Sequence, residues 1–174
     1  MKKIKSLAIV ALMVSATAAT FTSCGEGEIK QDSGLGVIKF LVSKLEGDLK
    51  FDASKKEDIA KALEMTAEDE YMSGKKEFKE KGYYVSQSVS LYEGTLQSVS
   101  YDSFYDDDKK EDAKKDSEEI KTFLNEKFGK ASDSYGETST WKKDNYSVDF
   151  TIYENGWGFY VRSNREVEYP EVEP

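Results

Sequence analysis

Residues 146–161 read YSVDFTIYENGWGFYV, and this stretch predicts a β-hairpin. Apolar side chains alternate with polar ones over residues 146–152, so the apolar set lines one face of a strand. Asn155-Gly156 is a strong signal for a hairpin turn. The alternation resumes over residues 157–161, which predicts a returning antiparallel strand.

A helix is predicted ahead of this hairpin, over residues 109–128. Its apolar side chains recur at helical spacing and form one face, namely Ile120, Phe123, Leu124 and Phe128. Gly129 follows as a C-cap, where a left-handed backbone is favourable. Trp141 is expected at the end of a further strand, with residues 143–145 as the turn into the hairpin.

A similar arrangement lies earlier in the chain and indicates an internal repeat. A shift of 61 residues places Leu63 on Leu124 and residues 89–93 on residues 150–154 without a gap. Because the same shift holds for a helix and a strand, it favours duplication of one α–β–β unit. Two unrelated amphipathic stretches also align at some shift, so chance similarity is the alternative.

Two helices are predicted in the first half. Ser54 as N-cap and Glu57 form a capping box, which starts a helix that extends to about Met65. Residues 37–45 fit a second helix, whose apolar face holds Ile38, Leu41, Val42 and Leu45.

The strands of the first half follow from the same alternation. One strand face consists of Tyr83, Val85, Val89 and Leu91, with Gln87 as an interruption. Glu93-Gly94 turns the chain into a returning strand over residues 95–101, in which Val99 corresponds to Val161. Residues 78–81 are interpreted as an additional strand.

These elements predict an α+β fold with helices packed on one face of an antiparallel sheet. The two tandem α–β–β units span about residues 49–101 and 104–163, within a single domain over residues 36–163. Residues 164–174 alternate acidic with apolar residues and carry both prolines. We expect this segment to be an extended acidic tail.

The amino-terminal residues have the three parts of a cleaved secretory signal. Lys2, Lys3 and Lys5 form a basic region, and residues 7–19 form an uncharged, mostly apolar core. This core is shorter than the roughly 20 apolar residues of a membrane-spanning helix. We therefore predict that residues 1–23 are a signal peptide that is removed.

The only cysteine, Cys24, stands where this signal ends. The tetrad Phe21-Thr22-Ser23-Cys24 resembles the lipobox of bacterial lipoproteins, although Phe21 occupies the place where leucine is common. The resemblance implies that Cys24 carries a diacylglyceryl group and a third acyl chain, and two such signals already suffice for stable anchoring. The alternative is an ordinary secretory signal with a cysteine nearby by chance.

An acylated Cys24 implies a cellular location. The protein would be held at the lipid bilayer of a bacterial cell envelope, most naturally the outer membrane, facing the periplasm or the surface. Residues 24–35 are rich in glycine and charge, so we expect a flexible tether. With one cysteine the domain has no internal disulfide.

The order of elements in residues 49–163 resembles the β-lactamase-inhibitor-like fold of small envelope lipoproteins. The resemblance rests on two tandem α–β–β units and not on a signature motif. It implies a protein-binding sheet face and a possible role in outer-membrane assembly, and it transfers no catalytic residue.

Several classes of chemistry are excluded by composition. The chain has no histidine, and its single cysteine is expected to be acylated, so histidine-containing zinc sites and the usual nucleophile–histidine arrangements are ruled out. We expect no cofactor and no metal. The net charge of −9 becomes more negative when the basic signal is removed, so nucleic acid is not an expected partner.

Carboxylates leave two alternatives open. Asp102 with residues 106–108 resembles a calcium loop only in charge, because the loop lacks an internal glycine and a terminal glutamate. A carboxylate pair could also act in a hydrolase. With 34 acidic residues, such a pair has no value as evidence until its geometry is known.

Four tyrosines are predicted on the strand faces opposite the apolar ones: Tyr84, Tyr92, Tyr153 and Tyr160. Tyrosine is frequent in binding interfaces, which makes this set the candidate binding residues. Tyrosine also simply favours strands, which is the structural alternative. The leading hypothesis is a non-enzymatic, membrane-anchored module that binds a protein or a glycan. A carboxylate-based hydrolase and an outer-membrane assembly factor are the alternatives.

Overall fold

The alternation in residues 146–161 forms the predicted hairpin. Strand β6 (Tyr146–Tyr153) pairs antiparallel with β7 (Gly156–Ser163), with Phe150 opposite Phe159. Both of these side chains are fully buried, as is Val161 two residues further along β7. The period-two pattern therefore sets the buried face of the hairpin.

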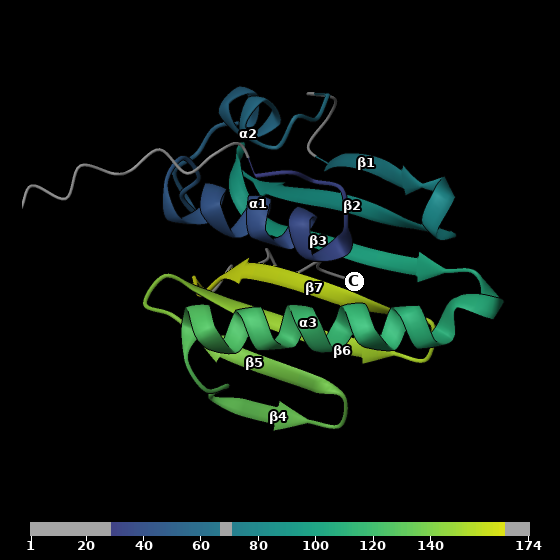
Figure 1. Cartoon of the computed structure of the whole chain (residues 1–174). Coiled ribbons are helices and arrows are strands. Elements are labelled where there is room, and N and C mark those ends of the chain that lie inside the picture. Colours follow the sequence, from purple (N-terminus) through teal and green to yellow (C-terminus); the bar gives the residue numbers. More distant parts are fainter. Residues whose placement is uncertain (1–28, 67–70, 166–174) are drawn as a thin grey trace, which may run out of the picture.

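The computed structural model describes residues 29–66 and 71–165, and these form an α+β fold (Figure 1). The helices are α1 (Gly34–Glu46), α2 (Lys56–Ala62) and α3 (Lys110–Phe128). The remaining strands are β1 (Tyr71–Phe78), β2 (Tyr83–Tyr92), β3 (Thr95–Tyr105), β4 (Asp133–Tyr135) and β5 (Thr138–Lys142). Short 3₁₀ turns occupy Lys79–Lys81 and Asp107–Lys109.

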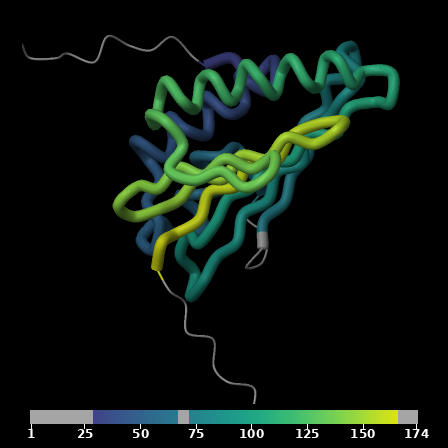
Figure 2. Tube along the Cα trace, turned by 90° about the horizontal axis from the view of Figure 1, so that it is seen from below, coloured from purple at the N-terminus to yellow at the C-terminus, as the bar shows by residue number. Residues whose placement is uncertain are grey.

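The strands make one antiparallel sheet in the order β1-β2-β3-β7-β6-β5-β4. Helices α1 and α3 lie side by side over one face, as Figures 1 and 2 show, and their apolar faces close the core. The prediction of helices over one face of an antiparallel sheet is confirmed for this pair. We call the opposite side of the sheet the open face.

Helix α3 begins at Lys110, one residue after the predicted start. It buries Ala113, Ser117, Ile120 and Leu124, whose spacing follows the helical repeat. Gly129 ends it with a φ of +84°, which confirms the predicted C-cap.

The predicted turn at Asn155-Gly156 is wrong by one residue. Tyr153 pairs with Gly156, so the two turn residues are Glu154 and Asn155. Gly156 is instead required by packing, because a Cβ at this position would clash with the backbone carbonyl oxygen of Ser103 in β3. The glycine therefore serves a close approach between strands.

The predicted capping box at Ser54 is also wrong. Helix α2 begins at Lys56, and its N-cap, Lys55, makes no side-chain hydrogen bond. The Ser54 hydroxyl accepts a hydrogen bond from the backbone N–H of Lys50 at 2.8 Å, so it closes the preceding turn. The helix ends at Ala62, before the predicted Met65.

The additional strand predicted over residues 78–81 is misplaced. The strand is β1, which ends at Phe78, and residues 79–81 form a 3₁₀ turn that leads to Gly82 at φ +69°. Its sequence, YMSGKKEF, has a weak apolar pattern because it is an edge strand paired only with β2. The first half therefore supplies three strands and the second half four, and the predicted α–β–β order is incomplete.

The tether predicted over residues 24–35 extends too far. Ser33 caps α1, its hydroxyl accepting from the Gly36 N–H at 3.1 Å, and Gly34 and Gly36 are buried. Gly34 packs against Asp116 and Trp157, so this glycine permits close packing where flexibility was expected. The predicted signal, Cys24 and residues 166–174 of the tail lie outside the described residues.

Candidate binding face

The open face carries the exposed aromatic side chains. Four large aromatic residues in the described chain are substantially exposed: Phe104 (43%), Tyr135 (90%), Tyr153 (47%) and Tyr160 (38%). Phe104 and Tyr160 lie on the open face because they alternate with buried residues of β3 and β7. Register places Tyr153 and Tyr135 on the same side, because Tyr153 shares a strand face with Thr151 and Tyr135 pairs with Thr138, the partner of Thr151. A sheet face with one covered and one solvated side is usual for antiparallel sheets, but the collection of aromatic residues on it is not required by the fold.

Two predicted tyrosines lie at one end of this face. Tyr84 stacks on Phe104 of the neighbouring strand, with ring centroids 5.0 Å apart. Lys75 places its Nζ 4.0 Å from the Tyr84 ring centroid. The hydroxyl of Tyr153 lies over Gly158 beside Asp102, on the other side of β3. We call Tyr84, Phe104 and Tyr153 the aromatic end.

The other two predicted tyrosines lie elsewhere. Tyr160 occupies the middle of β7, opposite Ser100 and Asp149. Tyr92 ends β2 at the far end of the sheet, where Glu93 and Gly94 turn with φ of +50° and +73°. The four tyrosines therefore share a face but do not form one cluster.

Phe104 was missed by the sequence argument. The returning strand was predicted to stop at residue 101, whereas β3 continues to Tyr105. Strict alternation over residues 101–105 was the signal that could have placed Phe104 on the open face, because Tyr101, Ser103 and Tyr105 are buried around it.

No protein-family model matches this chain, and comparisons with curated proteins and with solved structures found no significant match.

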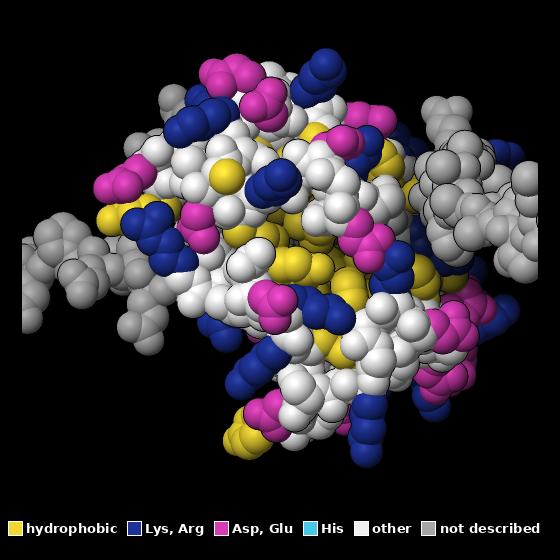
Figure 3. All heavy atoms as spheres, turned by 90° about the vertical axis from the view of Figure 1, so that its left-hand side faces the viewer, with side chains coloured by type: hydrophobic (Ala, Val, Ile, Leu, Met, Phe, Trp, Pro, Cys, Tyr) yellow, Lys and Arg dark blue, Asp and Glu magenta, His cyan; other side chains and the backbone are white. Residues whose placement is uncertain are grey.

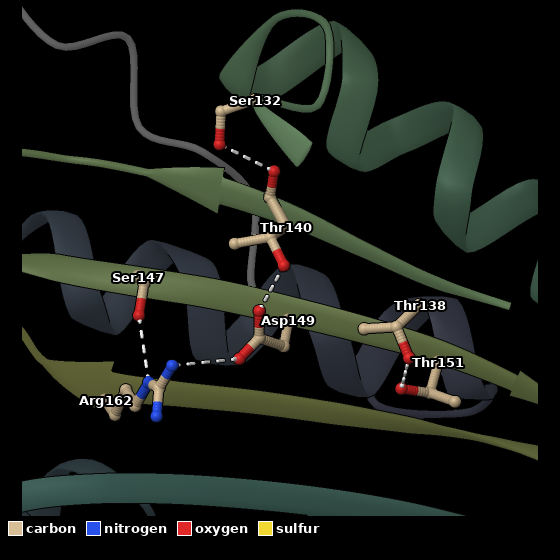
Figure 4. Close-up of polar contacts among 7 residues, drawn as sticks. All are labelled: Ser132, Thr138, Thr140, Ser147, Asp149, Thr151 and Arg162. Carbon is tan, nitrogen blue, oxygen red and sulfur yellow. Dashed lines mark hydrogen bonds and ion pairs between the residues drawn. The ribbon is translucent and has the colours of Figure 1, made fainter. Parts of the chain in front are cut away.

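A network of polar side chains covers the β5–β6–β7 part of the open face (Figure 4). Thr140 donates to Asp149 Oδ1 at 2.6 Å, and Arg162 Nε donates to the Ser147 hydroxyl at 3.3 Å. The hydroxyls of Thr138 and Thr151 lie 2.8 Å apart on the same face. These bonds hold the side chains in defined positions before any ligand arrives.

Burial raises the pKa of two neighbouring side chains at the aromatic end, Asp102 and Tyr153. It raises the pKa of Asp102 above its ordinary value, and burial followed by the Asp102 charge raises the pKa of Tyr153. Perturbed carboxyl groups occur at functional sites and in structural networks alike, so this shift supports the aromatic end only together with its geometry.

A second candidate site is a cleft of about 390 Å³ beside α3. Its carboxylate Asp116 accepts hydrogen bonds at Oδ2 from Tyr105, at 2.6 Å, and from Trp157 Nε1, at 3.0 Å. Burial, and then Asp116, raises the pKa of Tyr83 to about 12. Asp116 thus links α3 to the sheet. The phenols of Tyr83 and Tyr105 beside it stay protonated at neutral pH.

Two further findings concern the described residues alone. In residues 29–66 and 71–165, no group of three acidic, histidine or cysteine side chains is arranged to hold a metal ion. Over the same ranges, the helices lack the length and apolar character needed to cross a membrane.

Proposed function

We propose that this protein is a non-enzymatic binding module of a bacterial cell envelope. Acylated Cys24 would hold it at the outer-membrane bilayer, facing the periplasm or the surface. The open face of the sheet would contact an envelope protein or a surface glycan. The observation that carries this proposal is that all four substantially exposed aromatic side chains of the described chain lie on the face without helices.

The aromatic end supplies the strongest contact surface. Rigid aromatic side chains give a large contact area with little loss of side-chain entropy, so they dominate many interfaces. Tyr84 and Phe104 are already stacked on each other, which reduces the entropy that a partner must remove.

The anchor is supported by the sequence alone. The basic region, the short apolar core and Cys24 occur in the order of a lipoprotein signal. Labelled palmitate should enter the wild-type chain expressed in a Gram-negative host and should not enter a Cys24→Ser variant. Equal labelling of both proteins, or of neither, would contradict the anchor.

The binding face is tested by capture from native envelopes. Wild-type protein and a Phe104→Ala/Tyr153→Ala variant are immobilised, and retained proteins and glycans are compared. We expect the variant to lose the specific partner because two of the three side chains of the aromatic end are removed. Glu118→Ala, on the exposed side of α3, is the matched control and should retain it. Unchanged recovery by the aromatic variant would count against the proposal.

We also infer that the two halves derive from one duplicated unit. In support, β3 and β7 pair at the centre of the sheet with Val99 opposite Val161, and each half continues outward as a meander. The 61-residue shift aligns α2 with α3, although α2 has 7 residues and α3 has 19, and β4 has no counterpart among the described strands of the first half. An assembly factor remains a special case of the proposed module, and crosslinking to outer-membrane proteins during their insertion would identify it.

A further inference from the structure

The two arginines of the chain lie in one place. The sequence holds 25 lysines and arginines, and only Arg162 and Arg165 are arginine. Both line the same shallow groove at the end of β7. Arginine differs from lysine in its planar fork, which pairs with carboxylates and phosphates through two parallel hydrogen bonds. Their concentration in one groove suggests an anionic ligand.

No acidic residue of the described chain lines the groove itself, and two carboxylates beside it, Asp149 and Asp52, accept hydrogen bonds from the lining residues Thr140 and Ser163. It has a volume of about 440 Å³ and is formed by Gln97, Thr140, Lys142, Ser147, Tyr160, Arg162, Ser163, Asn164 and Arg165. Three of these described residues are cationic, and none of them is acidic, in a chain whose net charge is −9. Figure 3 shows the end of the molecule at which β7 finishes, where charges of both signs are mixed over the surface. The acid-free lining is therefore a local feature.

Arg162 is held in position from one side. Its Nε donates to Ser147, and its Nη2 lies 4.0 Å from Asp149 Oδ2, as Figure 4 shows. Asp149 is fixed in turn by Thr140. The Arg162 side chain is nevertheless 57% exposed, so its fork is oriented and still accessible.

The remaining lining suits a sugar ring. Tyr160 is the neighbouring open-face position on β7 and offers an exposed aromatic surface, on which the apolar face of a sugar can pack. Thr140 and Ser147 add hydroxyls and Asn164 adds an amide to the same lining. Gln97 also lines the groove, and its Oε1 is buried without a hydrogen-bond partner in the described chain. A ligand rich in hydroxyl groups could satisfy such an amide after a side-chain rotation.

We propose that this groove binds an anionic sugar residue of a surface polysaccharide, either a uronic acid or a sugar phosphate. The acidic group pairs with Arg162 and Arg165, and the ring packs on Tyr160. The inference rests on the proposed binding function and names the ligand class of one part of the open face. An acidic polymer is repelled by the body of the protein, so its recognition requires a local cationic site of this kind.

Calorimetric titration of the full-length chain tests this assignment. The probes are tetragalacturonate, glucose 6-phosphate, a neutral galactose tetramer and inorganic phosphate. We expect one or both acidic sugars to bind at least about tenfold more tightly than the neutral tetramer, since a charge-assisted hydrogen bond contributes at least that factor. The stronger of the two acidic probes identifies the source of the charge.

Single substitutions in the groove test the contribution of each contact to binding. Arg162→Gln and Arg165→Gln should each weaken binding about tenfold. Arg162→Lys should weaken binding nearly as much, because lysine keeps the charge but lacks the planar fork. Tyr160→Ala should weaken the sugar probes and leave inorganic phosphate unchanged. Lys114→Gln on α3 is the matched control. Unchanged thermal unfolding of each variant shows that the fold is intact.

Several results would overturn the assignment. These are equal binding of the neutral tetramer, equal binding of inorganic phosphate and the sugar phosphate, or binding that tolerates loss of both arginines. If the sugars fail but Phe104→Ala/Tyr153→Ala still abolishes envelope capture, the proposed function stands and only its ligand class is wrong.

Discussion

At the scale of single residues, Asp102 shows how the open face departs from a neutral surface. Burial raises the pKa of this carboxyl above its ordinary value of 3.8, so the folded chain binds its proton more tightly than the unfolded chain. The folded state is therefore favoured while Asp102 is protonated. That advantage disappears as the pH rises from the unfolded pKa through the folded one.

Replacement of Asp102 by asparagine should accordingly stabilise the protein at neutral pH. The gain in melting temperature should be present at pH 7 and should vanish as the pH falls well below 3.8, where Asp102 is protonated in both the folded and the unfolded wild type. Thermal unfolding of both proteins from pH 3 to pH 8 measures it. A pH-independent difference would mean that packing, and not charge, separates the two.

Asp116 stabilises the fold, because it joins α3 to β3 and β7 by accepting hydrogen bonds from Tyr105 and Trp157. Asp116→Ala leaves a phenol and an indole N–H without their acceptor, and we expect a loss of about 2 kcal/mol in the free energy of unfolding. Urea titration followed by tryptophan fluorescence measures this loss. Asp112→Ala, in the same helix but exposed, should change stability by less than about 0.5 kcal/mol.

At the scale of elements, the contact between β3 and the β6–β7 hairpin depends on Gly156. A methyl group there would collide with the backbone carbonyl of Ser103, which cannot rotate away as a side chain could. We expect Gly156→Ala to cost about 1–3 kcal/mol in unfolding free energy, the usual range for overpacking. Gly47→Ala, whose Cβ would meet only an ordinary contact, is the control. Equal stability of the two variants would show that β3 moves freely.

At the scale of the whole molecule, the two halves share one sheet. Strand β3 of the first half pairs with β7 of the second, so in either half alone one edge of its central strand would lack hydrogen-bond partners. We expect one cooperative unfolding transition. Both tryptophans belong to the second half and are buried, so their fluorescence should change at the same urea concentration as the far-ultraviolet circular dichroism of the whole chain. Separate midpoints would indicate that the halves unfold independently.

The antiparallel centre also explains why the predicted tyrosines are dispersed. Tyr92 and Tyr153 end corresponding strands in the repeat, and β3 and β7 run in opposite directions. Corresponding positions of the two halves therefore lie at opposite ends of the open face. A linear sequence comparison places them together, whereas the sheet separates them.

Elements with a strong local pattern could be predicted from the amino-acid sequence. The α3 face, the Gly129 cap and the alternation of β6 and β7 were all readable, because residues three or four apart share a helix face and alternate residues share a strand face. The α+β class followed from these elements.

Contacts between residues far apart in the sequence could be seen only in the tertiary structure. Edge strand β1, the use of Ser54 in a turn, and the burial of Gly34 and Gly156 depend on partners far away in the chain. The aromatic end and the two-arginine groove arise in the same way, since each combines side chains from several strands. Local patterns record which face of an element is buried, and long-range strand pairing determines what lies beside it.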